Sequence, residues 1–131
     1  MKQKTAPTIE DLVTLIETLR GKNGCPWDQE QTPVSMIGYL IDETNELEEA
    51  IETKISDDVC EELGDVLFQL LFIADIFKEK GDFTLQDSIT GIYEKMIRRH
   101  PHVFAGGKVN GVDDVKKQWL EIKAQEKGLK I

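Results

Sequence analysis

The sequence contains few cysteines, few prolines and no long apolar run, and each of these shortages narrows the class of protein. Its two cysteines, Cys25 and Cys60, form neither a C-x-x-C pair nor a dense framework, so neither a zinc site nor a disulfide scaffold is indicated. Four prolines and 40% hydrophobic residues favour a folded chain over a disordered one. We expect a single domain over residues 1–131 with reduced thiols, in which residues 1–7 form a loose N-terminus.

Positive charge is also scarce. The formal net charge of −9 argues against a nucleic-acid polymer or an anionic membrane as the main partner, because both require a broad basic surface. No apolar run reaches the ~18 residues needed to cross a bilayer, and residues 1–11 lack the apolar core of a signal peptide. These features predict a cytoplasmic protein whose anionic substrate, if it has one, is small and is bound through a local cationic patch and a metal.

Apolar residues recur at helical spacing along most of the chain, and no stretch has a convincing strand period. Thr8 with Asp11, Thr32 with Pro33, and Ser56 are expected to begin three of the helices as caps or first-turn residues. Short connections and apolar stripes predict an all-α bundle of about five helices. The expected helices are residues 9–20, 33–54, 57–80, 85–99 and 114–127, with a loop over residues 21–28.

Two apolar surfaces are expected to be covered. The stripe of the second helix should face the core, and it consists of Ile37, Leu40, Ile41, Leu47 and Ile51. The third helix is apolar nearly all round between Phe68 and Phe77, which is more than a small bundle buries by itself. We therefore expect oligomerisation to complete the bundle, with Phe72 in the subunit interface.

The stretch from residue 42 to residue 65 carries two acidic clusters. Residues three apart lie on one face of a helix, so Glu43 points the same way as Glu46, and Glu62 the same way as Asp65. If the two helices are antiparallel, four carboxylates meet around one point. Such a site suits a hard divalent cation, and Mg²⁺ favours all-oxygen ligands that it shares with substrate phosphates.

The alternative is that these acids are solvated surface charges, as most acidic runs on helices are. The second cluster argues against this, because it lies inside a strongly apolar helix. Buried carboxylates are costly unless they are paired or bind a metal, and no Lys or Arg occurs between Lys54 and Lys78. The pattern therefore favours a metal site.

Four separated motifs give the chain a family resemblance. They are DETNE at 42–46 with ELGD at 62–65, GCPWDQEQT at 24–32, KMIRRHPHVF at 95–104 and WLEIKAQEK from residue 119. The chain resembles the MazG-type nucleoside triphosphate pyrophosphohydrolases from about residue 9 to about residue 127. The family shows E-E-x-x-E followed by E-x-x-D, and Asp42 departs from the usual first Glu.

The resemblance implies roles for particular residues. It implies Mg²⁺, with Mn²⁺ as a possible substitute, bound by Glu43, Glu46, Glu62 and Asp65, which also form the catalytic group. It implies phosphate binding by Lys95 and Arg99 and base stacking by Trp119, and we add Trp27 and Gln31 as further base contacts. Relatives of this kind form homodimers or homotetramers. The same cations can instead stabilise a helix C-terminus, and a tryptophan at helical spacing is usually core.

The predicted activity is hydrolysis of a ribo- or deoxynucleoside triphosphate to the monophosphate and pyrophosphate, which would serve to clean the nucleotide pool. The Gly-x-x-x-x-Gly-Lys loop of ordinary NTPases is absent. Alternatives are a non-enzymatic helical interaction module and a related pyrophosphatase acting on phosphoribosyl-ATP, dUTP or dCTP. A di-iron bundle is disfavoured because it needs Glu-x-x-His pairs. The preferred base and sugar stay open.

Overall fold

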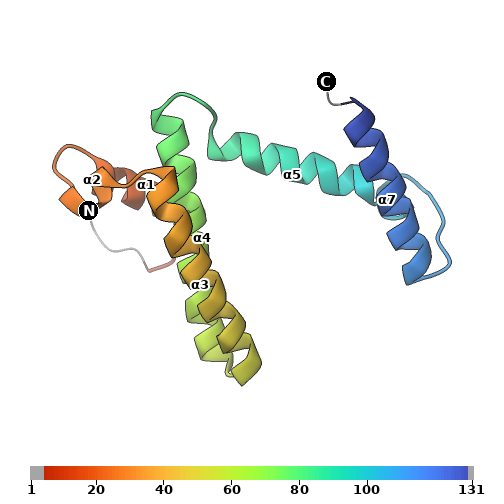
Figure 1. Cartoon of the computed structure of the whole chain (residues 1–131), viewed down its shortest axis with the longest axis horizontal. Helices are drawn as coiled ribbons and strands as arrows, with labels where there is room; N and C mark the ends of the chain where they lie inside the picture. Colours follow the sequence, from red (N-terminus) through yellow and green to blue (C-terminus); the bar gives the residue numbers. More distant parts are fainter. Residues whose placement is uncertain (1–4, 130–131) are drawn as a thin grey trace. The chain divides into compact units, whose positions relative to one another are not determined.

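The computed structural model describes residues 5–129, and all regular secondary structure in this range is helical. The predicted all-α class is confirmed, and the five expected helices are present with bounds that differ by at most two residues. Residues 1–4 of the expected loose terminus lie outside the described range. The helices are α1 (Ile9–Arg20), α2 (Pro26–Glu30), α3 (Pro33–Thr53), α4 (Ser56–Glu79), α5 (Leu85–Arg99), α6 (Pro101–Phe104) and α7 (Val112–Leu129) (Figure 1).

Two short helices were not expected from the sequence. Helix α2 lies partly in the predicted loop, where Pro26 occupies the first helical turn. Helix α6 likewise begins with Pro101, directly after α5. The chain divides into two compact units, residues 1–85 and 86–131. That the whole chain is one domain stays a prediction.

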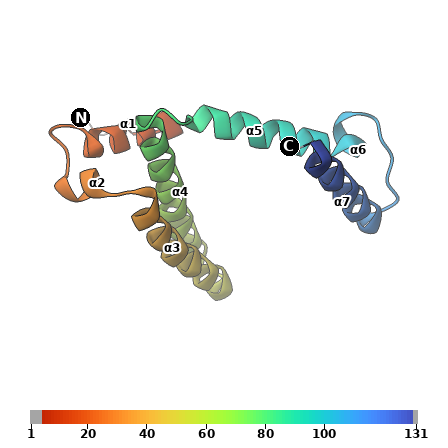
Figure 2. The same cartoon turned by 45° about the horizontal axis from the view of Figure 1, so that its top comes forward.

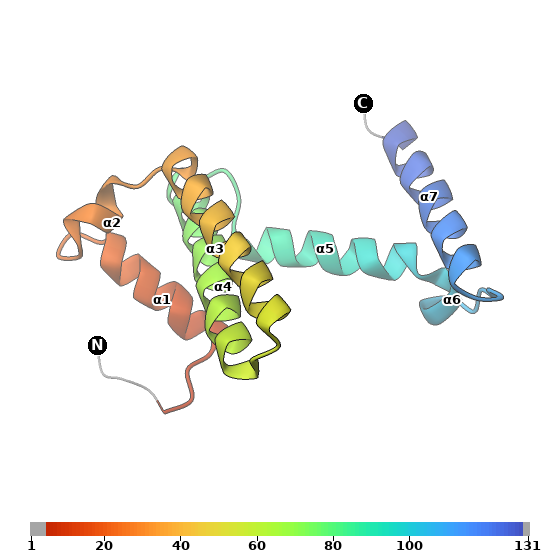
Figure 3. The ribbon, with the colours of Figure 1, turned by 60° about the horizontal axis from the view of Figure 1, so that its bottom comes forward.

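In the first unit, α3 and α4 run antiparallel and lie side by side (Figures 1 and 3). Lys54 ends α3 in the left-handed conformation, with a φ of 62°, and Ile55 is the extended residue that precedes α4. The prediction that Ser56 caps α4 was therefore wrong. Because the turn between the helices is so short, Ser56 already lies in the first turn of α4 and its side chain makes no capping hydrogen bond.

The core of the first unit lies where α1, α3 and α4 meet. Its buried residues are Ile16 of α1, Met36 of α3, and Leu71, Phe72 and Ile76 of α4. Phe72 is 0% exposed, so the expectation that it lies in a subunit interface was wrong. Its position on α4 faces α1 and α3 of its own chain.

The predicted core stripe of α3 was also wrong in part. Ile37, Ile41 and Ile51 are exposed, and α3 buries Met36 and Ala50 instead. Met36, Glu43 and Ala50 are spaced seven residues apart, so they share nearly the same face of α3. The face that packs on α4 is therefore rotated from the face that carries the exposed isoleucines. Sequence hydrophobicity alone overestimated the burial of the branched residues.

Two predicted N-caps are confirmed. The Thr8 hydroxyl accepts from the Asp11 N–H while the Asp11 carboxylate accepts from the Thr8 N–H, which is a reciprocal capping box. Thr32 makes the same exchange with Ser35, and Pro33 occupies the first turn. These caps determine where α1 and α3 begin.

The second unit consists of most of α5, then α6, a loop and α7 (Figure 2). Among residues 86–128 of this unit, none is fully buried. Polar contacts join its helices: both Arg98 and Arg99 of α5 pair with Glu126 of α7, and Gln118 lies 2.9 Å from Nδ1 of His102.

Two remaining expectations concern the cysteines and the membrane. Cys25 and Cys60 are free, as predicted. Within residues 5–129, no helix combines the length and apolarity that crossing a bilayer requires.

Candidate metal centre and substrate-binding residues

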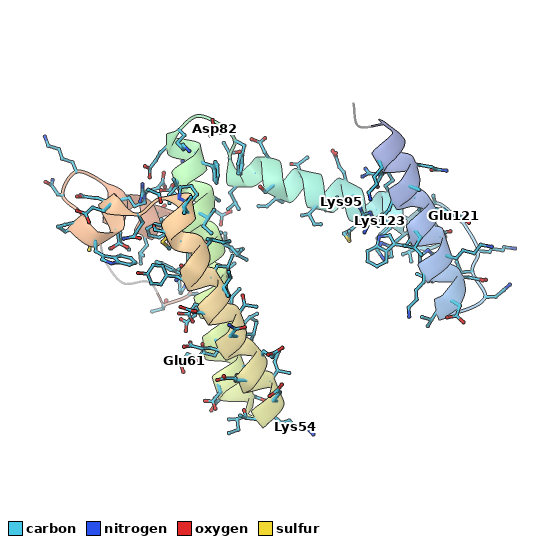
Figure 4. All side chains as sticks on the ribbon, in the orientation of Figure 1. Lys54, Glu61, Asp82, Lys95, Glu121 and Lys123 are labelled. Carbon is cyan, nitrogen blue, oxygen red and sulfur yellow. The ribbon has the colours of Figure 1, made fainter. Side chains whose placement is uncertain are left out.

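The four predicted metal-site carboxylates come together between α3 and α4. One oxygen each from Glu43, Glu46, Glu62 and Asp65 lies within 4.8 Å of the others. We call this group the acid quartet. Oxygen-bearing side chains gather along this half of the helix pair, whose far end is marked by Lys54 in Figure 4.

Helix periodicity explains why these side chains meet. Three-residue spacing places both acids of each helix on one face, and the face of α3 that carries Glu43 is the one that buries Met36 and Ala50, seven residues away on either side. On α4, the acids share a face with the buried Phe72. The packing that buries the apolar residues therefore also brings the acids of both helices together.

The acid quartet is electrostatically unfavourable without a cation. The Oε2 atoms of Glu43 and Glu62 are buried and find no hydrogen-bond partner among residues 5–129. Burial, followed by repulsion from Glu46, raises the pKa of Glu62 from 4.5 to about 7. The same two causes raise the pKa of Glu43. Within the described residues, none of the ion pairs involves the quartet.

These observations fit a divalent cation. Carboxylate oxygens are the ligands that Mg²⁺ and Mn²⁺ prefer, and two orphaned buried oxygens are the kind of unpaired group that a bound ion would satisfy. Asp42 is exposed and lies outside the quartet, and Glu61 is exposed at the outer edge of the helix pair (Figure 4).

The predicted base contacts Trp27 and Gln31 lie in the α2 segment of the first unit. The Trp27 ring meets the Tyr39 ring edge-on, with centroids 5.5 Å apart. The Gln31 amide is already engaged, because its Nε2 donates to the Trp27 carbonyl and its Oε1 accepts from the Ser35 hydroxyl. Gln31 thus shapes the segment that carries Trp27.

Arg20, which the sequence analysis missed, anchors this segment. Its guanidinium donates to the Asp28 carbonyl at 2.5 Å and to the Gln31 carbonyl at 3.1 Å. It also binds both carboxylate oxygens of Glu79 on α4, at 2.6 and 3.0 Å. An arginine in the last turn of a helix is common for dipole reasons alone, so its sequence position carried no sign of this role.

Gly24 allows the same loop to lie close against α1. A Cβ atom there would lie 2.1 Å from the Leu19 carbonyl oxygen, to which the next residue, Cys25, donates its N–H. Only glycine fits such an approach. The GCPW stretch therefore has a structural reason as well as a family resemblance.

The predicted phosphate-binding residues belong to the second unit and differ in their surroundings. The largely buried Arg99 donates to Glu126 at 2.8 Å, and Arg98 donates to the other oxygen of the same carboxylate. Hydrogen bonds from Arg99 and then Arg98 lower the pKa of Glu126 to about 2. Lys95 forms no ion pair within the described chain. Its charge is thus the less committed of the two.

Trp119 is not a core residue, although most tryptophans at helical spacing are. Its ring is partly exposed, and Arg99 and Lys123 each lie over the ring at 5.7 Å from its centroid. A partly exposed aromatic ring with cations beside it suits contact with a base that carries phosphates. Trp119, Lys95 and Arg99 thus lie in one unit and the acid quartet in the other.

Comparison with known proteins gives a consistent result. Residues 31–104 match the family described as the MazG nucleotide pyrophosphohydrolase domain. The chain is 53% identical over 121 residues to the nucleoside triphosphate pyrophosphohydrolase/pyrophosphatase MazG of Thermotoga maritima, covering 92% of this chain and 46% of that protein. It is 42% identical over 123 residues to the nucleoside triphosphate pyrophosphohydrolase of Escherichia coli K12, covering 93% of this chain and 47% of that one.

Two further matches complete the comparison. An uncharacterised Bacillus subtilis protein, YabN, is 52% identical over 114 residues, which cover 87% of this chain and 23% of that protein. The chain thus spans less than half the length of these curated relatives. Among solved structures, a MazG-related protein from Thermotoga maritima matches with a TM-score of 0.74 and 28% identity, over 88% of this chain and 99% of that one.

Proposed function

The chain belongs to the MazG nucleotide pyrophosphohydrolase family, and we propose that it hydrolyses a nucleoside triphosphate to the monophosphate and pyrophosphate with Mg²⁺. The observation that carries the proposal is the acid quartet, in which two buried oxygens lack partners within the described chain. We propose that the reaction takes place in the cytoplasm and serves to clean the nucleotide pool, as is consistent with free thiols.

The quartet supplies the ligands and the base. Glu43, Glu46, Glu62 and Asp65 would hold Mg²⁺, which when bound neutralises phosphate oxygens and orients water. A water oxygen attacks the α-phosphorus, the bond from that phosphorus to the bridging oxygen breaks, and pyrophosphate leaves with the bond electrons. A carboxylate of the quartet that is left free of the metal, or is bound to it only through water, accepts the water proton as general base.

Lys95 and Arg99 are proposed to stabilise the negative charge of the departing pyrophosphate. The charge of Lys95 is the more available of the two for a phosphate, because Arg99 already shares its charge with Glu126. Lys95→Ala should therefore raise KM or lower kcat without loss of stability, whereas Arg99→Ala should also lower the melting temperature. Steady-state kinetics and thermal melts of both variants test this difference. Equal melting temperatures for the two variants would contradict it.

Trp119 and Trp27 are each proposed as a stacking surface for a nucleobase, and Gln31 supports the second of these by holding the Trp27 segment in place. Which base and which sugar are preferred is decided by experiment. We propose incubating the protein with ribo- and deoxynucleoside triphosphates, including dUTP and dCTP, in Mg²⁺ or Mn²⁺. Phosphoribosyl-ATP belongs in the same panel.

The decisive measurement is the fate of ¹⁸O from labelled water. Attack at the α-phosphorus places the label in the monophosphate, and chelation of the metal stops the reaction. Label in pyrophosphate would mean attack at the β-phosphorus, and orthophosphate as the first product would replace the proposal with an ordinary NTPase. An absence of both Mg²⁺ binding and product would favour an interaction module.

We also propose a homodimer or homotetramer, with an interface other than the one expected from the sequence. Leu63 and Leu70 are seven residues apart on α4 and are 57% and 48% exposed. Exposed apolar faces of this kind commonly mark contacts between identical chains. Leu70→Asp should lower the mass measured by light scattering, and Glu61→Lys on the same helix serves as the control. A monomeric wild type would overturn this proposal.

A further inference from the structure

The first unit buries one acid that the proposed reaction does not use. Asp75 of α4 is 5% exposed, and no other charged residue among residues 5–129 is buried to this extent. It precedes Glu79 by four residues, so the two carboxyl groups share one face of the helix. Both line a cleft of about 260 Å³ between α1 and α4, together with Arg20. A charged group in such a place needs a partner.

The partner of Asp75 is a second carboxyl group. Its side chain forms a hydrogen bond with Glu79. Such a bond requires a proton, because ionised carboxylates only accept. Burial is the main cause that raises the pKa of Asp75 to about 6, and the bond to Glu79 is the next. A hydrogen bond from Arg20 is the main cause that lowers the pKa of Glu79. Asp75 therefore holds the proton and donates it to the ionised Glu79.

The other groups that face Asp75 are few. Glu17 of α1 raises the pKa of Asp75 further, and Lys78 of α4 lowers it. These two groups form an ion pair with each other at 2.9 Å, so their effects on Asp75 oppose one another. Residues 33–36, which begin the neighbouring helix α3, have no titratable side chain. Arg20 is thus the cation that stabilises the pair of acids.

Arg20 connects this pair to the segment that carries Trp27. Its guanidinium donates to both oxygens of Glu79, at 2.6 and 3.0 Å, and to the carbonyls of Asp28 and Gln31. We call this set of bonds the Arg20 anchor. The Asp28 carboxylate adds an electrostatic attraction for the same guanidinium. The proton between the two acids thus lies one residue away from the side chain that holds the α2 segment in place.

We propose that Asp75 is a proton-dependent positioning residue, which keeps the Arg20 anchor closed while it is protonated and loosens it on losing the proton. Without the proton, two charged acids one turn apart compete for one guanidinium. Glu79, whose side chain is 46% exposed, is the acid that can turn toward water. Because the pKa of Asp75 is raised, its stabilising bond is fully present below pH 3.8 and is lost as the pH rises through about 6. The inference does not depend on the proposed reaction.

Hydrogen exchange read by mass spectrometry measures the anchor in the full chain. The amides of Gln29 and Gln31 report on it, because both bond within the anchored segment. In the wild type, exchange of residues 25–31, corrected for the intrinsic rate, should rise by about fivefold or more between about pH 5 and about pH 8. Exchange that does not rise would overturn the proposal.

Variants of Asp75 separate the proton from the rest of the side chain. Asp75→Asn still donates to Glu79 but does not titrate, so at about pH 8 residues 25–31 should exchange as slowly as in the wild type at about pH 5. Asp75→Leu has no donor and should exchange fast at both. Asp82→Asn, at an exposed position of the same unit (Figure 4), is the matched control and should follow the wild type. An asparagine variant that also follows the wild type would overturn the proposal.

Nuclear magnetic resonance follows the proton itself. The ¹³C carboxyl signal of Asp75, identified by its absence in Asp75→Asn, should titrate near 6, and the indole N–H signal of Trp27 should shift with the same midpoint. The asparagine variant should lose that midpoint. Titration of Asp75 at its ordinary pKa of 3.8 would overturn the proposal. Faster exchange spread evenly over α1, α3 and α4 would show a loss of global stability and would overturn the positioning role.

Discussion

Two acidic sites in this chain have opposite electrostatic surroundings: the acid quartet and the single carboxylate of Glu126. Between α3 and α4, four acids converge with no cation paired to them in the described chain, and the pKa of Glu62 rises to about 7. Between α5 and α7, one acid meets two guanidinium groups, and the pKa of Glu126 falls to about 2. The second group is satisfied by the chain itself and holds its helices together. The acid quartet has no such partner among residues 5–129, so a bound cation would be needed to offset its repulsion.

The largest expected effect concerns turnover. Glu62→Ala and Asp65→Ala should each lower kcat/KM by at least about 100-fold, or about 2.7 kcal/mol, because each removes a proposed ligand. Glu61→Ala, an exposed neighbour on the same helix, should stay close to wild type. Circular dichroism should show the helical fold in all three. A ligand variant that retains more than about a tenth of the activity would remove the distinction between the quartet and ordinary surface acids.

The next largest effect is expected on stability, from the loss of Arg20 and its several hydrogen-bond partners. Arg20→Ala should lower the free energy of unfolding by about 2 kcal/mol, since it removes charge-assisted bonds to Glu79 and leaves two backbone carbonyls without their donor. Lys78→Ala, which breaks an exposed ion pair with Glu17, should cost at most about 1 kcal/mol. Urea denaturation of both variants compares them. Similar costs would mean that Arg20 does not anchor the α2 segment.

Neutralising one acid in each group should have effects of opposite sign. In chelator, Glu62→Gln should raise the melting temperature because it removes repulsion, whereas Glu126→Gln should lower it because two arginines lose their partner. Adding Mg²⁺ should raise the melting temperature of wild type and of Glu126→Gln, but far less that of Glu62→Gln. Differential scanning calorimetry tests the pattern. Shifts of the same sign in chelator would contradict the comparison.

The smallest expected effect is a difference in pH dependence. Because the pKa of Glu126 is lowered, its stabilisation of the fold is present above pH 4.5 and is lost as the pH falls from about 4.5 to about 2. Because the pKa of Glu62 is raised in the metal-free protein, its contribution to the stability of the fold is fully present below pH 4.5 and is lost as the pH rises through about 7. Thermal melts across this range should show both slopes. Glu126→Gln should remove the acid slope, and Glu62→Gln its share of the neutral one.

The local features of the fold were predictable from the sequence because they depend on neighbours along the chain. The Thr8–Asp11 box and the Thr32–Pro33 start needed only side chains within three residues of each other. The acid quartet was also predictable, since three-residue spacing and one antiparallel turn suffice to make the four carboxylates converge. The roles of Lys95, Arg99 and Trp119 stay predictions drawn from the family resemblance.

The sequence by itself determined the helices, most of their ends and the meeting of the four acids. Only the tertiary structure decided which face of α3 is buried, so that Met36 replaced Ile37 in the core and Phe72 became an interior residue. It also decided that Arg20 reaches the carbonyls of α2 and that Glu126 neutralises Arg99. Hydrophobicity gives a residue's tendency to be buried, but the rotation of each helix and the partner of each charge depend on contacts between residues far apart in the chain.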